Sequence, residues 1–250
     1  MRSEKMGTFQ SILSVTFMIF LFKGSHAYGM HIMEGYLPIK WSIFWWALYL
    51  PFFFVGVKKL KQSLSENLEK KLLISLIGAF IFLVSAIKLP SLTGSSSHAT
   101  GIALGAILLG PSSVFVLGAL VLFFQATLLA HGGYTTLGAN AVSMAVVGAL
   151  VSYFIYTLFR KRMNNKVAIF LAAALGDLLT YICTALQLAL AHPVDGVNYI
   201  DSIIKFLGVF AVTQIPLAII EGLITVVIIN MLPVDLISST LIKKEVTANA

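Results

Sequence analysis

Charged residues are scarce in this sequence. They make up 11% of the 250 residues, whereas hydrophobic residues make up 58%. A soluble globular protein carries roughly 25% charged residues, so the composition excludes an ordinary soluble domain. The apolar residues gather in long runs, and a run of about 20 apolar residues is long enough to cross a bilayer as a helix. We therefore predict an all-α membrane protein.

Cysteine and several catalytic motifs are also missing or nearly so. The one cysteine, Cys183, lies within an apolar run, which excludes an internal disulfide and a Cys-x-x-Cys motif. The sequence has no Gly-rich P-loop ending in Gly-Lys-Ser/Thr, so we expect no ATP bound in that way. It has no His-Glu-x-x-His motif either, which argues against a zinc protease of that type. We predict that the chain is not an enzyme.

Residues 1–29 have the features of a secretory signal peptide. Basic residues at the start precede a short apolar stretch, Ile12–Phe22, and small residues follow it. The small-x-small cleavage pattern fits two positions, one before Met30 and one before Tyr28. An uncleaved first transmembrane helix is the alternative, but the apolar stretch is short for a span. Cleavage would create a new free amine at the start of the mature chain.

Seven apolar segments follow, and we expect them to share one core and form a single domain over residues 30–250. The segments are Trp41–Val57, Leu72–Leu89, Thr100–Gly110, Ser112–Ala130, Leu137–Phe159, Val167–Ala191 and Ile203–Leu232. The third is short and ends at a Gly-Pro pair, which predicts a half-length helix. The last contains Pro216, which a membrane helix tolerates with a kink.

Basic residues cluster between the first two segments, between the fifth and sixth, and in the C-terminal tail. The positive-inside rule places all three clusters in the cytoplasm. Two cytoplasmic loops are separated by an even number of crossings, so Thr100–Gly110 must count as a crossing. We predict about seven transmembrane helices in the cell membrane, with the mature N-terminus outside and the C-terminus in the cytoplasm. Residues 60–71 are expected to form a polar loop. The net charge of +7 is then a topology signal, and we expect no nucleic-acid partner.

This topology places four histidines on the outer side, which suggests a metal site there. They are His31, His98, His131 and His192. If the mature chain begins at Met30, its amine, the His31 backbone nitrogen and the His31 ring Nδ1 can chelate one ion. Three nitrogens in one plane suit Ni(II), Cu(II) or low-spin Co(II), and His98 is placed to supply the fourth donor. An interfacial His31 that binds no ion is the alternative.

Several stretches resemble the CbiM/NikM family, the substrate-binding components of energy-coupling-factor importers for cobalt and nickel. They are MHIMEGYLP at Met30–Pro38, GSSSHATG at Gly94–Gly101, LGAILLGP at Leu104–Pro111, AHGGYTTLGAN at Ala130–Asn140 and QIPLAIIEG at Gln214–Gly222. The resemblance covers essentially the whole mature chain. One departure is Ala99, because the family commonly has proline after its loop histidine.

The resemblance implies that Met30, His31 and His98 hold the metal, and that Co(II) or Ni(II) is the transported substrate. It implies partners that drive uptake: a transmembrane coupling subunit, two ATPase subunits and often a small accessory membrane protein. It also implies that the cobalt serves cobalamin synthesis. A nickel-specific importer subunit remains an alternative.

The remaining polar residues leave further alternatives open. We interpret His131-Gly132-Gly133 as a tight turn that lines the metal cavity or lies beside it, rather than as a ligand. Asp177 and Glu221 lie inside apolar segments, where ionisable groups are often functional. We interpret them as structural hydrogen-bond acceptors. As proton carriers they would instead make the chain a gradient-driven secondary transporter. A membrane enzyme with an open metal position is the other rival.

Overall fold

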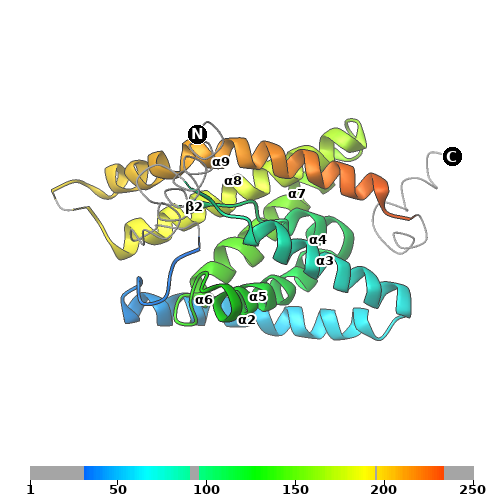
Figure 1. The fold of residues 1–250 in the computed structure, drawn as a ribbon, viewed down its shortest axis with the longest axis horizontal. Helices are drawn as coiled ribbons and strands as arrows, with labels where there is room; N and C mark the ends of the chain where they lie inside the picture. Colours follow the sequence, from blue (N-terminus) through cyan, green and yellow to red (C-terminus); the bar gives the residue numbers. More distant parts are fainter. Residues whose placement is uncertain (1–30, 91–95, 195, 234–250) are drawn as a thin grey trace, which may run out of the picture.

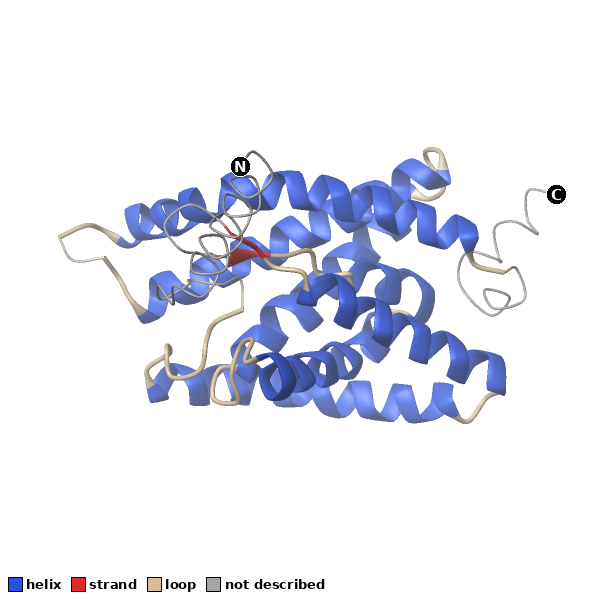
Figure 2. Ribbon diagram, viewed as in Figure 1, coloured by secondary structure: helices blue, strands red, loops and turns tan. Residues whose placement is uncertain are grey.

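The computed structural model describes residues 31–90, 96–194 and 196–233, and this part of the chain is almost entirely helical (Figure 2). The helices are α2 (Ile39–Leu64), α3 (Leu68–Ala86), α4 (Ile102–Leu109), α5 (Pro111–Leu129), α6 (Leu137–Asn140), the π-helix η2 (Ala141–Gly148), α7 (Ala149–Phe159), α8 (Asn165–Ala191) and α9 (Tyr199–Met231). Two short strands, β1 (Leu89–Pro90) and β2 (Ser96–Ser97), pair antiparallel. Helices α2, α3, α8 and α9 run along the long axis of the molecule (Figure 1).

Each predicted apolar segment coincides with a helix, and α6, η2 and α7 together form the fifth. Among the described residues, five helices are long and apolar enough to cross a membrane: α2, α5, the continuous run Leu137–Phe159, α8 and α9. Helix α4 has eight residues, which span about 12 Å and cannot alone cross a hydrocarbon core of about 30 Å. The predicted signal peptide lies outside the described residues.

The prediction of a polar loop over residues 60–71 is wrong. Helix α2 continues to Leu64 and α3 begins at Leu68, because the lysine, glutamine and leucine residues here are good helix formers even where the apolar run has ended. Asn67 starts α3 by accepting a hydrogen bond from Lys70 N at 2.8 Å. The connection is therefore a short turn between two helices.

Helix α4 lies wholly inside the bundle. All residues from Ile102 to Leu108 are buried, and glycines with positive φ flank the helix, Gly101 at +68° and Gly110 at +83°. A broken helix within a membrane requires that the freed backbone groups find partners inside the protein. The backbone break at Gly101 therefore lies inside the protein, where other helices surround α4.

The two ends of the bundle carry different sequence features. The basic stretches 58–71 and 160–166 lie at the α2–α3 and α7–α8 turns, and both turns are at the right-hand end in Figure 1. The segment before α2, strand β2 and the α8–α9 connection lie towards the opposite end (Figure 1). The predicted cytoplasmic loops thus share one end, and the histidine-bearing loops share the other.

Candidate metal centre

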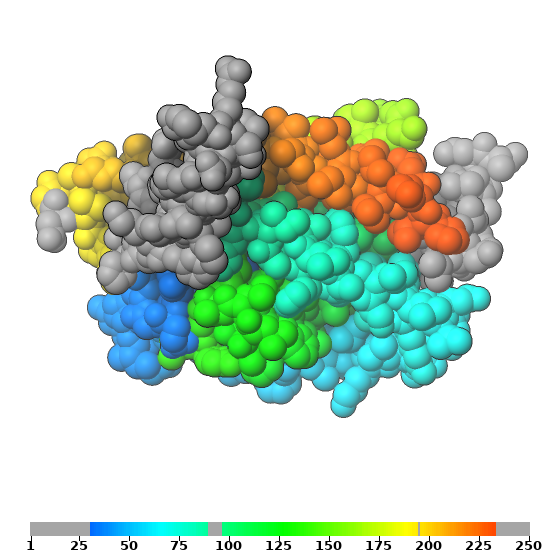
Figure 3. All heavy atoms as spheres, in the orientation of Figure 1, coloured from blue at the N-terminus to red at the C-terminus, as the bar shows by residue number. Residues whose placement is uncertain are grey.

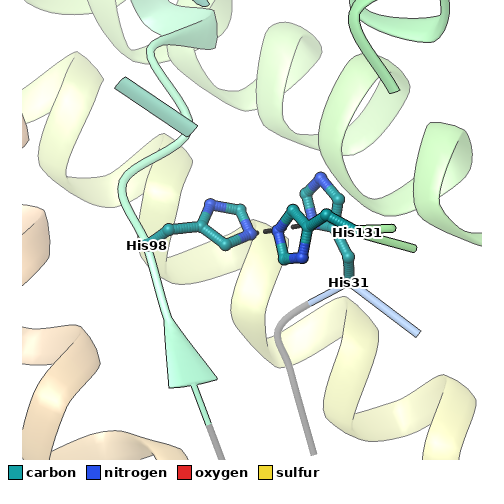
Figure 4. Close-up of side chains that lie close together, drawn as sticks. All are labelled: His31, His98 and His131. Carbon is teal, nitrogen blue, oxygen red and sulfur yellow. Dashed lines mark hydrogen bonds between the residues drawn. The ribbon is translucent and has the colours of Figure 1, made fainter. Parts of the chain in front are cut away.

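Three histidines from distant parts of the sequence converge between the helices (Figure 4). His31 precedes α2, His98 follows β2, and His131 follows α5. Each is buried, with 2%, 0% and 4% of its surface exposed, respectively. One ring nitrogen from each can be chosen so that all three lie within 4.8 Å of one another. Such a group of buried imidazoles can hold a metal ion.

His31 and His98 direct ring nitrogens at each other. His98 Nε2 lies 2.8 Å from His31 Nδ1 (Figure 4), and the ring planes are inclined by 79°. Two donors that each lie about 2.0 Å from one ion, at a right angle, are about 2.8 Å apart. His98 Nδ1 faces the Ala99 carbonyl oxygen at 3.0 Å, and a proton donated there leaves Nε2 free to bind an ion. This contact is a hydrogen bond between the two rings, and its length equals the separation of neighbouring corners of a square-planar site.

Burial keeps these histidines neutral. Loss of solvation lowers the pKa of His98 to about 4 and lowers the pKa values of His31 and His131 well below their ordinary value. Repulsion from neighbouring imidazoles lowers the pKa values of His31 and His131 further, and the positive charge of Lys88 adds to the effect at all three rings. Because neutral imidazole is the form that binds metal, the cluster is ready to coordinate an ion at neutral pH.

The residue after His31 is fixed by two side chains from the segment between α5 and η2. Asn140 accepts a hydrogen bond from Ile32 N at 2.8 Å and donates one to Ile32 O at 3.0 Å. Thr136 Oγ1 also donates to Ile32 O, at 2.6 Å. Both backbone polar groups of Ile32 are thus satisfied, and His31 is held at the bundle interior.

Glu34 makes a second attachment to the same segment. Its carboxylate accepts hydrogen bonds from Thr135 N at 3.1 Å and Thr135 Oγ1 at 2.5 Å, and its N–H donates to Gly132 O at 3.2 Å. Burial alone would raise the pKa of Glu34, but the hydrogen bonds outweigh it and lower the pKa below its ordinary value. A Cβ on Gly133 would overlap the Glu34 backbone, so glycine makes this contact possible. In Figure 3 the blue atoms of the first part of the described chain lie against the green atoms of the region that contains this segment.

Known proteins are similar to this chain in sequence and in fold. Residues 31–234 match the family described as the cobalt uptake substrate-specific transmembrane region, CbiM. The chain belongs to the CbiM family. It is 55% identical over 205 residues to the cobalt transport protein CbiM of Clostridioides difficile, covering 82% of each chain, and 56% identical over 216 residues to that of Desulforamulus reducens, covering 86% of each.

A crystal structure of a truncated transition metal transporter has the same fold. It superposes with a TM-score of 0.71 at 26% identity, covering 80% of this chain and 96% of the other. CbiM is a family of transporters rather than enzymes. With several helices able to span a membrane, this CbiM-family chain is a multi-pass membrane transport protein.

In this CbiM-family chain His131 lies in the turn after α5 and also packs directly against His31. Its ring lies on the His31 ring, with centroids 4.5 Å apart and planes inclined by only 10°. Its Nε2 is buried and has no hydrogen-bond partner among the described residues. Imidazole lone pairs lie in the ring plane, so a ring parallel to His31 does not aim a nitrogen at an ion held in that plane. The sequence signal for His131 was its place among the outer histidines.

The other predicted residues do not belong to the histidine cluster. Met30 lies outside the described residues. His192 lies away from the cluster, with its Nε2 2.7 Å from Tyr36 O. Asp177 and Glu221 are buried, with 1% of each exposed, and Glu221 accepts hydrogen bonds from backbone and side chain of the segment after His98.

Proposed function

We propose that this CbiM-family chain captures Co(II) at the outer face of the cell membrane, as the substrate-binding component of an importer. The observation that carries the proposal is the 2.8 Å approach of His31 Nδ1 to His98 Nε2 between two buried, neutral rings. Coordination alone is required of the chain. The ion is its cargo and undergoes no reaction.

The proposed ligands are the Met30 amine, the His31 backbone nitrogen and Nδ1, and His98 Nε2. Removal of residues 1–29 as a signal peptide would free the Met30 amine. The attachment of Ile32 to Asn140 supports this set, because it holds the His31 backbone and ring on the same side of the bundle as His98. Four nitrogens in a plane suit Co(II) in its low-spin state and Ni(II). His131 packs on the chelating ring as a wall of the site.

We further propose seven membrane crossings in one domain over residues 30–250. Helix α3 supplies one of the two that remain, and the short α4 supplies the other together with the segment 96–101 that leads into it. The mature N-terminus then lies outside and the C-terminus in the cytoplasm. The gathering of the basic turns at one end of the bundle supports this orientation (Figure 1). The third basic cluster, in the tail, lies outside the described residues.

ATP-driven transport by this chain would draw on partners, because the sequence has no P-loop for ATP. We propose the energy-coupling-factor arrangement: a transmembrane coupling subunit, two ATPase subunits and a small accessory membrane protein, with the cobalt serving cobalamin synthesis. A gradient-driven transporter that uses Asp177 and Glu221 is the competing mechanism. Uptake that continues after ATP is depleted, with the ion gradients intact, would favour that mechanism.

The deciding experiment compares bound metal in two purified chains, one beginning at Met30 and one that retains Gly29. The extra residue converts the Met30 amine into an amide and removes one donor, while every residue from Met30 onward stays the same. We expect about one Co(II) per chain at neutral pH for the first form and little for the second. Equal binding by both forms would remove the amine from the ligand set.

Nickel is the second candidate cargo, because a plane of four nitrogens also suits Ni(II). A competition between Co(II) and Ni(II) for the chain beginning at Met30 would decide between them. Retention of Co(II) against equimolar Ni(II) supports cobalt capture, and its displacement would identify a nickel importer.

A further inference from the structure

The segment that follows His98 is held by a carboxylate from near the other end of the chain. Glu221 Oε2 accepts a hydrogen bond from Thr100 N at 2.5 Å, and Oε1 accepts bonds from Thr100 Oγ1 and Gly101 N, each at 2.9 Å. Glu221 and Thr100 are each only 1% exposed. One side chain of α9 thus fixes the backbone two and three residues after His98.

The position of Glu221 follows from the broken helix α4, which begins at Ile102 with Gly101 as its N-cap. The first N–H groups of a helix have no partner within the helix, and inside a bundle they cannot bond to water. The Glu221 carboxylate accepts bonds from the N-cap Gly101 N and from Thr100 just before it, while Ile102 N faces Thr100 Oγ1 at 3.4 Å. The carboxylate also lies at the positive end of the helix dipole. The three donors therefore offset the cost of burying the carboxylate.

A second residue of α9 contacts the same segment. Gln214 lies two helical turns before Glu221, and its Nε2 is 3.4 Å from His98 O and 2.5 Å from Asp177 Oδ2. Ser97 Oγ lies 2.7 Å from Thr213 Oγ1. Helix α9 therefore contacts the residues before and after His98, and it also contacts the His98 carbonyl oxygen.

We propose that Glu221 is a positioning residue for metal capture: by fixing the Thr100–Gly101 turn on α9, it directs His98 Nε2 at His31 Nδ1. Gln214, whose amide also donates to Asp177, holds the His98 carbonyl in support. The role rests on the proposed function, since it presumes that His98 is a ligand. Glu221 itself touches no ligand atom and acts through the turn.

A double-mutant cycle tests this role in the chain that begins at Met30. The variants are Glu221→Gln, which keeps the shape but replaces one carboxyl oxygen with an amide group, His98→Ala, and the double variant. The measurements are the Co(II) dissociation constant, by competition with a chelator, and the absorption spectrum of bound Co(II). We expect Glu221→Gln to weaken binding about 10- to 100-fold and to shift the spectrum towards that of His98→Ala. In the His98→Ala background it should weaken binding no further.

Tyr49→Phe is the matched control for stability. It removes a buried hydrogen bond between helices, from Tyr49 OH to Phe115 O at 2.8 Å, which touches nothing at the site. It should lower Tm without changing Co(II) affinity or spectrum. If Glu221→Gln lowers Tm but leaves Co(II) affinity and spectrum unchanged, the positioning role is wrong. The role is also wrong if Glu221→Gln weakens Co(II) binding by the same factor in the His98→Ala background.

Two further outcomes are distinguishable. If His98→Ala itself keeps full Co(II) affinity, the proposed ligand set fails, whatever Glu221 does. If Glu221→Gln does not fold, Thr100→Val replaces it in the cycle, because it removes the hydroxyl hydrogen bond to Glu221 and the long contact with Ile102 N but leaves both backbone bonds to the carboxylate. A several-fold loss of affinity that vanishes in the His98→Ala background supports the role, and no loss overturns it.

Discussion

At the residue scale, the three buried histidines differ in the direction of their ring nitrogens. His98 is inclined by 79° to His31, and their facing nitrogens are 2.8 Å apart. His131 lies parallel to His31, with the ring planes inclined by 10°. Since imidazole binds a metal through a lone pair in its own plane, proximity alone does not make all three rings ligands. Substitutions of His98 and of His131 should therefore have different effects on Co(II) affinity.

His131→Phe retains a flat ring over His31 but removes both nitrogens. We expect the Co(II) affinity of this variant to stay within a few-fold of the parent, whereas His98→Ala should lose more than about 100-fold. Isothermal titration with Co(II) of the chain that begins at Met30 measures both. A loss in His131→Phe as large as that in His98→Ala would show that His131 is a ligand.

The lowered pKa values of the histidines predict an acid-sensitive fold around the site. The pKa of His98 is about 4 in the folded protein, against an ordinary value of 6.5, so between these values the unfolded chain binds more protons. Stability is therefore complete above about pH 6.5 and falls as the pH drops towards 4. Tm of the metal-free protein, measured from pH 8 to pH 4, checks this. In His98→Gln the dependence should be shallower, and an unchanged profile would contradict the assignment.

At the element scale, the sequence predicted the helices better than their contacts. Runs of apolar residues located each long helix of the described residues, and the Gly-Pro pair at Gly110 predicted the half-length α4. The π-helix Ala141–Gly148 and the stacking of His131 on His31 were not predictable. Both depend on packing between segments far apart in the chain, which hydrophobic periodicity does not encode. Of the predicted ligands, the structure brings His31 and His98 together, and the role of Met30 stays a prediction.

The segment between α5 and α6 receives the N-terminal segment only because Gly133 lacks a side chain. In Gly133→Ala, the new methyl group would overlap the Glu34 backbone, so His31 should no longer reach its place and Co(II) binding should fall at least about tenfold. Gly208→Ala is the matched control, because its Cβ would meet nothing within 4 Å and alanine favours the helix. Binding measured by chelator competition should be normal in the control. Normal binding in both variants would exclude the proposed docking of the segment.

At the scale of the whole molecule, the separation of basic turns from histidine-bearing loops predicts a fixed orientation. In a Cys183→Ser background, Lys61→Cys lies at the basic end and Tyr199→Cys at the start of α9, at the opposite end. We expect a membrane-impermeant maleimide to label the thiol at position 199 in intact cells and the thiol at position 61 only after the membrane is opened. The reverse pattern would invert the proposed topology.

The burial of His31 and His98, at 2% and 0% exposure, bears on how long a captured ion stays. The N-terminal segment supplies a ring to the proposed site and is attached to the bundle through Ile32–Asn140 and Glu34–Thr135, so we expect a captured ion to leave when these contacts open. The residence time is then governed by the frequency of this local opening rather than by the strength of a competing chelator in solution. Two family members with the same donors but different docking contacts would have identical spectra and different release rates.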